Sequence, residues 1–261
     1  MSNDPLLQCK NMVMKFGGLI ATNDVSFNVD KGEILCLMGP NGAGKSTILN
    51  MITGIYRPTS GSLRFNGLDL TKLAPYDIVA HGIARTFQNS RLFSDLSVLD
   101  NVIIGMHTQG TTGVLDAFFR PGRVRREMEV AAERAGELLE AVSKDLYKQK
   151  DRPASDLAQA DRRRLEIARA LASKPKLILL DEPSAGMDDR ETQALVDDIR
   201  RAHTIHPELS IIIIEHDMQL VADLPDSVIV LDYGIKIAEG TFEEVCAVER
   251  VQEAYLGGAH A

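Results

Sequence analysis

The sequence has no long apolar run. Within its 261 residues, no stretch approaches the ~18 consecutive apolar side chains that a membrane-spanning helix requires. The polar first residues, Met1 to Asp4, also lack the charged and then apolar layout of a secretion signal. These absences argue against an integral membrane protein and against a secreted one, so we expect a compact chain that stays in the cytosol.

Cysteine and net positive charge are scarce as well. Cys9, Cys36 and Cys246 are too scattered for a metal-binding spacing, and their odd number argues against a disulfide framework, so we expect buried reduced thiols. Lys and Arg number 29 against 37 Asp and Glu, a formal net charge of −8. Nucleic-acid binding usually shows a basic balance or a basic face. The basic run Arg120 to Arg126 is interpreted as the solvated start of a helix, and no nucleic-acid partner is expected.

A glycine-rich stretch carries the strongest chemical signal. It fits the phosphate-binding pattern G-x-x-x-x-G-K-[ST] with Gly39, Pro40, Asn41, Gly42, Ala43, Gly44, Lys45 and Ser46. An apolar run, Ile34 to Met38, precedes it, and a helix-compatible segment, Lys45 to Thr53, follows. Glycines let backbone N–H groups turn toward phosphate oxygens, and the helix directs its positive end at the same charge. A glycine-rich turn with a chance lysine is disfavoured because every fixed position and both flanks agree.

The same stretch predicts the roles of single side chains. Lys45 would reach the β- and γ-phosphates of a nucleotide, and the Ser46 hydroxyl would ligate Mg²⁺. Thr47 completes the expected nucleotide-binding segment.

An acidic pair follows another apolar run. Leu177 to Leu180 shows no polar alternation, which is typical of a strand buried on both faces of a parallel sheet, and Asp181 and Glu182 come next. Open α/β sheets bind ligands at the carboxyl ends of their strands. In a phosphate-loop protein, Asp181 can hold Mg²⁺ with its hydration shell, and Glu182 can orient or deprotonate the attacking water. The alternative is a pair of exposed carboxylates at a strand end.

The sequence alone does not decide the roles of three further residues. His216 follows the apolar run Ile211 to Ile214, so its imidazole could meet a γ-phosphate at the sheet edge that holds Asp181, although a lone histidine is more often structural. Phe16, beside two glycines, is either a core aromatic or a platform that stacks on adenine. Gln88 lies in a polar segment and carries little weight by itself.

A shift in composition divides the chain. Residues His107 to Gly122 are mainly Gly, Thr and short polar types, which mark an internal boundary. Beyond it, apolar residues recur at three- and four-residue steps from Val124 to Val142, which predicts a long amphipathic helix, and a second helix should end before Pro175. We expect an α/β fold with a mainly parallel sheet, an antiparallel β subdomain and a helical insertion. The expected parts of this one domain, 1–261, are a core with the β subdomain (1–93 and 174–240), a mainly helical subdomain (94–173) and a C-terminal helical tail (241–261).

Together the motifs resemble the ATP-binding cassette family, the nucleotide-binding subunits of ABC transporters. Gly39 to Ser46 correspond to its Walker A loop, Gln88 to its Q-loop, and Asp181 with Glu182 to its Walker B pair. Phe16 corresponds to the adenine-stacking aromatic and His216 to the switch histidine. The segment that resembles the D-loop is Ser184, Ala185, Gly186, Met187 and Asp188.

The resemblance covers nearly the whole chain and implies a phosphate-loop NTPase that uses ATP and Mg²⁺. It implies Ser46, Gln88 and Asp181 around the metal, and Glu182, His216 and Gln88 as catalytic residues. Several segments are similar, more narrowly, to the cassettes of branched-chain amino acid importers: Phe16 to Gly18, Ile83 to Phe93, Arg164 to Ala170, Ile214 to Met218 and Glu253 to Gly257. The implied function is an ATPase that powers import of branched-chain amino acids or a related small polar solute, from the inner face of the cell membrane.

One segment departs from the family pattern. Where the family has the signature L-S-G-G-Q, this chain has Leu157, Ala158, Gln159, Ala160 and Asp161. In the family two cassettes pack head to tail, and the signature of one contacts the γ-phosphate bound by the other. Ala158 lacks the hydroxyl, Ala160 adds a methyl group and Asp161 places a negative charge near a polyphosphate. We therefore expect a weak signature, and a partner cassette that is not a copy of this chain, although a homodimer stays open.

The resemblance also implies partners and leaves alternatives. The partners are a second ABC cassette, transmembrane permease subunits that meet the surface around Phe87 to Phe93, and, indirectly, a periplasmic or extracellular solute-binding protein. One alternative is a nucleotide-gated regulatory cassette with little or no turnover. Another is a soluble ABC protein of translation or DNA repair, which usually carries two cassettes or a long coiled-coil insertion that this chain lacks.

Overall fold

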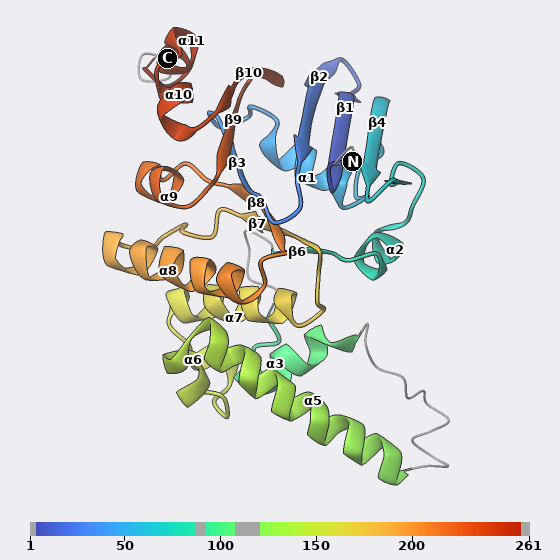
Figure 1. Cartoon of the computed structure of the whole chain (residues 1–261), viewed down its shortest axis with the longest axis vertical. Helices are drawn as coiled ribbons and strands as arrows, with labels where there is room; N and C mark the ends of the chain where they lie inside the picture. Colours follow the sequence, from blue (N-terminus) through green and yellow to red (C-terminus); the bar gives the residue numbers. More distant parts are fainter. Residues whose placement is uncertain (1–3, 87–91, 108–120, 257–261) are drawn as a thin grey trace. The chain divides into compact units, whose positions relative to one another are not determined.

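The structure is a computed structural model that describes residues 4–86, 92–107 and 121–256 (Figure 1). Packing divides the chain into two units. The first comprises Met1–Arg85, Lys176–Ser184 and His206–Ala261, and the second comprises Thr86–Pro175 and Ala185–Ile205. The second unit therefore includes Ala185–Ile205, a segment that we had assigned to the core from the sequence.

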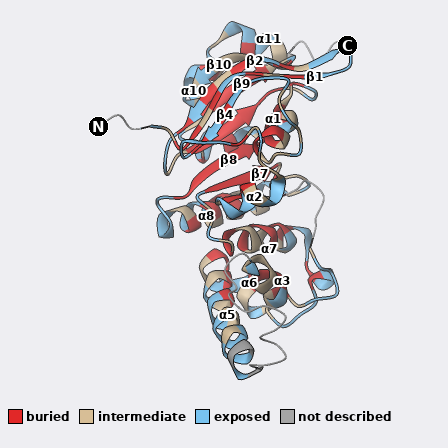
Figure 2. Cartoon of the chain, turned by 90° about the vertical axis from the view of Figure 1, so that its right-hand side faces the viewer, coloured by how far each residue is buried: buried red, intermediate tan, exposed pale blue. Residues whose placement is uncertain are grey.

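A six-stranded sheet forms the centre of the first unit. Its strands are β3 (Ile34–Met38), β6 (Ile83–Arg85), β7 (Leu177–Asp181), β8 (Ser210–Ile214), β9 (Ser227–Asp232) and β10 (Ile235–Gly240). The order is β10-β9-β3-β8-β7-β6, with all neighbours parallel except β10 and β9. Every residue of β3, β7 and β8 is buried, and Figure 2 shows this on β7 and β8. The unalternating apolar runs thus formed buried parallel strands, as the sequence predicted.

A second, antiparallel sheet has the order β2-β1-β4-β5. Its strands are β1 (Leu7–Phe16), β2 (Leu19–Val29), β4 (Ser60–Phe65) and β5 (Leu68–Asp69). The turn between β4 and β5 consists of Asn66 and Gly67, with φ angles of 48° and 80°. An Asn-Gly pair tolerates two positive φ angles, so this hairpin follows from local sequence.

One helix of the first unit joins its two sheets. α1 (Lys45–Ile52) contributes Ile48, Leu49, Met51 and Ile52 to an apolar cluster that also holds residues of β1, β2, β4, β3, β7, β8 and β9. The other helices of this unit are α2 (Pro75–Ala80), α9 (Met218–Asp223), α10 (Phe242–Cys246) and α11 (Glu249–Leu256). α10 starts with a capping box between Thr241 and Glu244.

The second unit is helical. Its elements are α3 (Val98–Gly105), α5 (Pro121–Val142), α6 (Lys144–Lys148), the 3₁₀ turn η2 (Ala154–Asp156), α7 (Gln159–Leu171) and α8 (Asp189–Ile205). α5 is the predicted long amphipathic helix, and it buries Ala135, Leu139 and Val142. Among the helices that the structure describes, none has the length and apolar character to cross a membrane.

The cysteines match their expected state in part. Cys9 and Cys36 are buried free thiols, and burial raises the pKa of both. Cys246 is also free but only half-buried, so the expectation of burial was wrong for this residue.

Candidate functional site

The glycine-rich stretch forms one wall of a cavity of about 430 Å³ in the first unit. Asn41 to Thr47 line it from the loop and the start of α1, and Glu182 lines it from the end of β7. The remaining lining residues come from the β1–β2 turn region and from the turn before β10: Phe16, Leu19, Ile20, Ala21 and Tyr233. The structure therefore brings the loop, one predicted catalytic carboxylate and the predicted aromatic platform around a single space.

The backbone at Gly44 shows why this position is glycine. Its φ is 99°, and a Cβ atom there would lie 2.6 Å from the Ala21 carbonyl oxygen. No other residue type could take this conformation without moving the chain of β2. Gly44 precedes α1 directly, so the first N–H groups of that helix have no intrahelical acceptor and stand at the cavity. This is the arrangement that binds phosphate groups at a helix N-terminus.

Lys45 is buried with its ammonium group folded onto the loop. Its Nζ donates to the carbonyl oxygens of Gly39 at 2.5 Å and Pro40 at 3.0 Å. Burial lowers the pKa of Lys45, and the nearby carboxylates of Glu182 and Asp181 oppose this shift. An ammonium has three donors, so these two bonds leave capacity for an anionic ligand in the cavity.

The sheet register brings the predicted site residues to one edge. β8 lies between β3 and β7, and Ile214 is opposite both Leu37 and Asp181. The glycine-rich loop follows β3, Glu182 follows β7, and His216 follows β8 by two residues. All three segments therefore leave the carboxyl edge of the parallel sheet, which is where such sheets bind ligands.

Asp181 is held by an arginine that the sequence did not single out. Arg85 Nη2 donates to Asp181 Oδ2 at 2.7 Å, and the two side chains are only 7% and 9% exposed. Arg85 Nη1 donates to Asn50 Oδ1 on α1 at 2.7 Å. A buried ion pair thus connects the ends of β6 and β7 with the helix that follows the loop.

Glu182 has an unusual backbone conformation. Its φ is 49°, and its N–H donates to the Ile214 carbonyl oxygen at 3.0 Å. A left-handed conformation is costly for a glutamate and tends to persist at functional sites where the surrounding structure enforces it. Here it turns the chain at the end of β7 so that Glu182 lines the cavity.

Glu215 is a second residue that sequence reasoning missed. It is completely buried between the ends of β7 and β8. Its Oε1 accepts the Ser184 N–H at 2.8 Å, and its Oε2 accepts the His216 N–H at 3.1 Å. One carboxylate therefore connects the turn that carries Glu182 with the start of the loop that carries His216. The imidazole of His216 is exposed and makes no hydrogen bond to any residue that the structure describes.

Phe16 packs against one aromatic ring and shares the cavity with another. Phe16 is 41% exposed and meets the Tyr56 ring edge to face, with centroids 5.1 Å apart. Tyr233, which sequence reasoning did not consider, lines the same cavity and is 87% exposed. The rings of Phe16 and Tyr233 both offer exposed faces on which a planar base could stack. Gln88, predicted as a catalytic and metal-site residue, lies outside the residues that the structure describes.

Comparison with protein families decides the classification. The model of the ABC transporter family matches residues 22–185, which include the loop, the β7 carboxylates and the signature segment. The chain belongs to the ABC transporter family. It is an ATP-binding cassette with ATPase activity, as the sequence resemblance implied. A second model, described as the branched-chain amino acid ATP-binding cassette transporter, matches the C-terminal residues 236–261 of the cassette.

Full-length relatives agree with this assignment. The cassette is 40% identical to the high-affinity branched-chain amino acid transport ATP-binding protein LivG of Salmonella typhimurium, over 98% of this chain and 100% of the relative. It is 38% identical to BraF, the corresponding protein of Pseudomonas aeruginosa, over 98% and 99% of the two chains.

A solved structure confirms the fold. The ADP conformation of MJ1267, an ATP-binding cassette of an ABC transporter, matches with a TM-score of 0.82 and 31% identity over 97% of this chain and 99% of that one. The predicted fold class, an α/β phosphate-loop NTPase core with a mainly parallel sheet, an antiparallel β sheet and a helical part, is confirmed.

The signature segment of this cassette lies at the start of α7 in the second unit. Leu157 and Ala160 are buried, and Ala158 is the N-cap residue with φ and ψ of −60° and 160°. Gln159 Nε2 donates to the Ala185 carbonyl oxygen at 2.8 Å. Gly186, with φ of 80°, lies so close that a Cβ atom there would be 2.6 Å from Gln159 Nε2. The altered signature therefore packs on the D-loop of its own chain.

The charge of Asp161 is compensated inside the second unit. Its Oδ1 accepts from Arg164 Nη1 at 3.1 Å and its Oδ2 from Gln149 Nε2 at 2.9 Å. Arg164 also donates to Asp198 of α8 at 2.6 Å, and Arg201 reaches the other oxygen of Asp198 at 3.3 Å. Burial works against the charge of Arg164, but its bonds to Asp198 and Asp161 outweigh this and raise its pKa.

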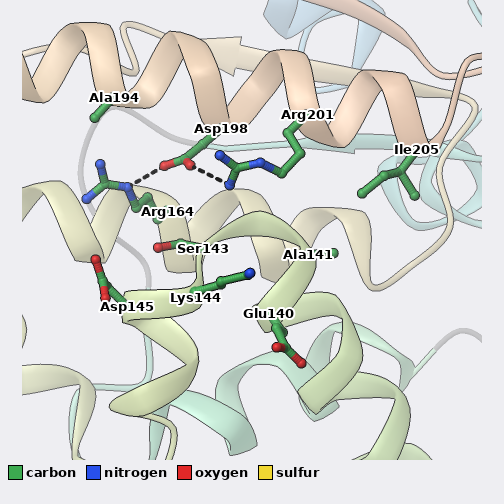
Figure 3. Close-up of a pocket in the computed structure, with 10 residues that line it drawn as sticks. All are labelled: Glu140, Ala141, Ser143, Lys144, Asp145, Arg164, Ala194, Asp198, Arg201 and Ile205. Carbon is green, nitrogen blue, oxygen red and sulfur yellow. Dashed lines mark hydrogen bonds and ion pairs between the residues drawn. The ribbon is translucent and has the colours of Figure 1, made fainter.

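Figure 3 shows how Arg164 and Arg201 converge on Asp198 beside a cavity of about 590 Å³. Sequence reasoning found the negative charge of Asp161 but not its partners, which are Arg164 on α7 itself and Gln149 after α6. α8 contributes Asp198 and Arg201, which extend the network from Arg164. The network fixes the signature helix α7 against α8.

The D-loop spans the two units. Ser184 belongs to the first and Ala185 to Asp188 to the second. Asp188 caps α8: its Oδ1 accepts the Glu191 N–H at 2.8 Å, while Glu191 Oε2 accepts the Asp188 N–H at 3.1 Å. Met187 is half-buried and Gly186 exposed.

Proposed function

We propose that this cassette binds MgATP and hydrolyses it to drive the import of branched-chain amino acids, or of a related small polar solute, through membrane permease subunits. The observation that best supports this proposal is the single cavity lined by Gly44, Lys45, Ser46 and Glu182. The named relatives and the match of the C-terminal segment support the amino-acid substrate.

Phosphate recognition follows from the loop. Its N–H groups and the start of α1 supply several donors at once, and the ammonium of Lys45 supplies the positive charge. Lys45 is held by two carbonyl oxygens of the loop itself, so it stands at the site before a ligand arrives. The adenine would stack against Phe16, with Tyr233 as a second exposed ring beside it.

The donor set suits Mg²⁺. Magnesium sites in nucleotide enzymes use one or two protein oxygens and complete the shell with phosphates and water. The Ser46 hydroxyl and the Asp181 carboxylate are oxygens of this kind, and Gln88 is the third residue that we propose for the site. Within the described residues, no group of three or more His, Cys, Asp or Glu side chains could hold a metal. When bound, Mg²⁺ would neutralise phosphate charge as the γ-phosphoryl group leaves.

Hydrolysis requires a residue that orients and deprotonates water. We assign this role to Glu182, because it lines the cavity and its strained backbone fixes its direction. His216 would donate a hydrogen bond to the γ-phosphate side of the site, and Gln88 would couple that side to movement of the helical unit. Glu215 holds the segments of Glu182 and His216 together.

A second cassette would complete the site with its own signature. The signature of this chain keeps a helix N-terminus, whose N–H groups can donate hydrogen bonds to an anion, but it lacks a serine hydroxyl at Ala158. We therefore propose slow ATP turnover by the isolated chain and faster turnover with a partner whose signature is intact. The complex would also contain the permease subunits, with a solute-binding protein acting through them, and would place the cassette peripherally on the inner face of the membrane.

The alternative of a regulatory cassette with little turnover has less support. The relatives are named as transport ATP-binding proteins, and the residues proposed for hydrolysis are all present. The named relatives are transport proteins and not translation or repair factors.

The test is a reconstituted complex of this cassette with its second cassette and permeases in vesicles, with the solute-binding protein added. We expect phosphate release to rise when leucine, isoleucine or valine is added with the binding protein, and not with urea. If urea or a short amide stimulated phosphate release instead, the transported solute would be that compound and not a branched-chain amino acid. Phosphate release that ignores every solute, with intact ATP binding, would support the regulatory alternative.

A further inference from the structure

Arg85 is placed to act on the metal site without touching a nucleotide. It is the last residue of β6, next to β7 in the sheet, and its side chain is buried. One nitrogen of its guanidinium group, Nη2, donates to Asp181, and the other, Nη1, donates to Asn50 at 2.7 Å and reaches the Thr53 hydroxyl at 3.4 Å. Arg85 thus connects the proposed metal carboxylate with α1, the helix that begins at the phosphate loop.

The position of Asp181 needs such a partner. A carboxylate that is 9% exposed loses most of its hydration, and a buried charge is tolerated only when it is paired and hydrogen-bonded. The planar guanidinium fixes the direction of each bond, whereas the ammonium of a lysine is a rotatable donor on a flexible stem that fixes no direction. The direction in which Asp181 presents its oxygens is therefore set jointly by β7 and by Arg85.

We propose that Arg85 is a positioning residue for Mg²⁺. It holds the Asp181 carboxylate in the orientation that the metal requires and, through Asn50, keeps that carboxylate in register with the Ser46 end of α1. The inference rests on the proposed function, because it takes Asp181 and Ser46 as the protein oxygens around the metal.

Removing Arg85 should change how much Mg²⁺ raises the affinity for a nucleotide, and it should leave the affinity without metal nearly unchanged. The loop, Lys45 and the aromatic rings bind the nucleotide without contacting Arg85 in any described bond. Arg85→Gln should therefore leave the affinity for a metal-free ATP analogue within about twofold. It should reduce the gain in affinity that Mg²⁺ provides by about tenfold, the equivalent of one charge-assisted hydrogen bond.

The experiment is calorimetric titration of the purified full chain with a non-hydrolysable ATP analogue, in Mg²⁺ and in EDTA. Arg64→Gln, on an exposed position of β4, is the matched control and should behave as wild type. Arg85→Lys should recover part of the gain, because it restores the charge but not both bonds. Asn50→Ala, which keeps the ion pair, should lose less of the gain than Arg85→Gln.

A double-mutant cycle separates positioning from a general effect on the fold. Asp181→Asn alone should remove most of the Mg²⁺ gain, and adding Arg85→Gln should change it no further. The inference would be overturned if the two substitutions reduced the Mg²⁺ gain additively. It would also be overturned if Arg85→Gln lowered the affinity for the ATP analogue equally with and without Mg²⁺, or if that variant kept the full Mg²⁺ gain. A wild type without any Mg²⁺ gain would instead overturn the proposed function and this inference with it.

Discussion

Replacing Glu215 with glutamine tests how the two water-activating segments are held together. The carboxylate is fully buried: its Oε1 accepts the N–H of Ser184, and its Oε2 accepts the N–H of His216 and, at 3.4 Å, that of Asp217. Glutamine has nearly the same shape but replaces one acceptor oxygen with an NH₂ donor. Whichever way the amide turns, one backbone N–H then faces another donor, and either the Glu182 side or the His216 side of the connection is lost.

The expected magnitude follows from that loss. A hydrogen bond to a charged group contributes about 1.5–3 kcal/mol, and an orphaned buried donor costs about 1–3 kcal/mol. Removal of the buried negative charge offsets part of this, because Glu215 has no cationic partner among the described ion pairs. We expect the free energy of unfolding to fall by about 2 kcal/mol, which lowers Tm by roughly 4–8 °C for a chain of this size.

The functional loss should be selective. Lys45 and the loop make no bond to Glu215, so the KM for MgATP should stay within about twofold. The kcat of the cassette complex should fall at least about tenfold, because a displacement of a catalytic group by an ångström has effects of that order or more. Phosphate release measured over a range of ATP concentrations gives both constants, and calorimetry or fluorescence gives Tm. Glu208→Gln, an exposed glutamate before β8, is the matched control. A Glu215→Gln variant with wild-type kcat, or one that loses kcat and ATP affinity equally, would refute the positioning role.

Three further changes test other parts of the site. Gly44→Ala should abolish the rise in Tm that MgATP causes, because its Cβ would collide with the Ala21 carbonyl, while Gly18→Ala, with no atom near its Cβ, should keep that rise. Lys45→Met should also abolish the ATP-induced rise, because it removes the ammonium that we propose for phosphate binding, and a full rise in that variant would contradict this role. Gln159→Ala should speed hydrogen exchange of the D-loop amides near Ala185 by several-fold, because it removes the bond that fixes them, and unchanged exchange would show that this bond is dispensable.

The sequence specified much of the site because its signals are local. The loop pattern and the unalternating runs before Asp181 and Glu215 each occupy a few consecutive residues. Their strand ends could be expected to share one edge from the rules for parallel sheets alone. The register of Ile214 against both Leu37 and Asp181 agrees with that expectation.

The supporting residues could not be found in this way. Arg85 and Asp181 are 96 positions apart and meet only because β6 and β7 are neighbours in the sheet, an order that no local pattern reveals. Glu215 could not be singled out, because its burial depends on the turn after β7, whose Ser184 N–H it accepts. Asp161 is paired with Arg164, three residues on in α7, and with Gln149 after α6. The contact with Gln149 and the link from Arg164 to Asp198 of α8 depend on how the helices pack, so no local pattern revealed them.

Helix α8 could have been predicted from the sequence. α8 was not predicted, although Thr192, Leu195, Val196, Ile199 and Ala202, its buried residues, recur at three- and four-residue steps and Asp188 precedes it as a cap. A periodicity count over 188–205 would have found it.

The central claim is that this cassette hydrolyses ATP with Glu182 as the residue that activates water. The most direct measurement is phosphate release by the reconstituted complex under saturating MgATP, with ATP binding measured on the same samples, for wild type and Glu182→Gln. We expect the variant to bind ATP within about threefold of wild type and to release phosphate at least about a hundredfold more slowly, the usual contribution of a general base. Phosphate release by Glu182→Gln at the wild-type rate would contradict it.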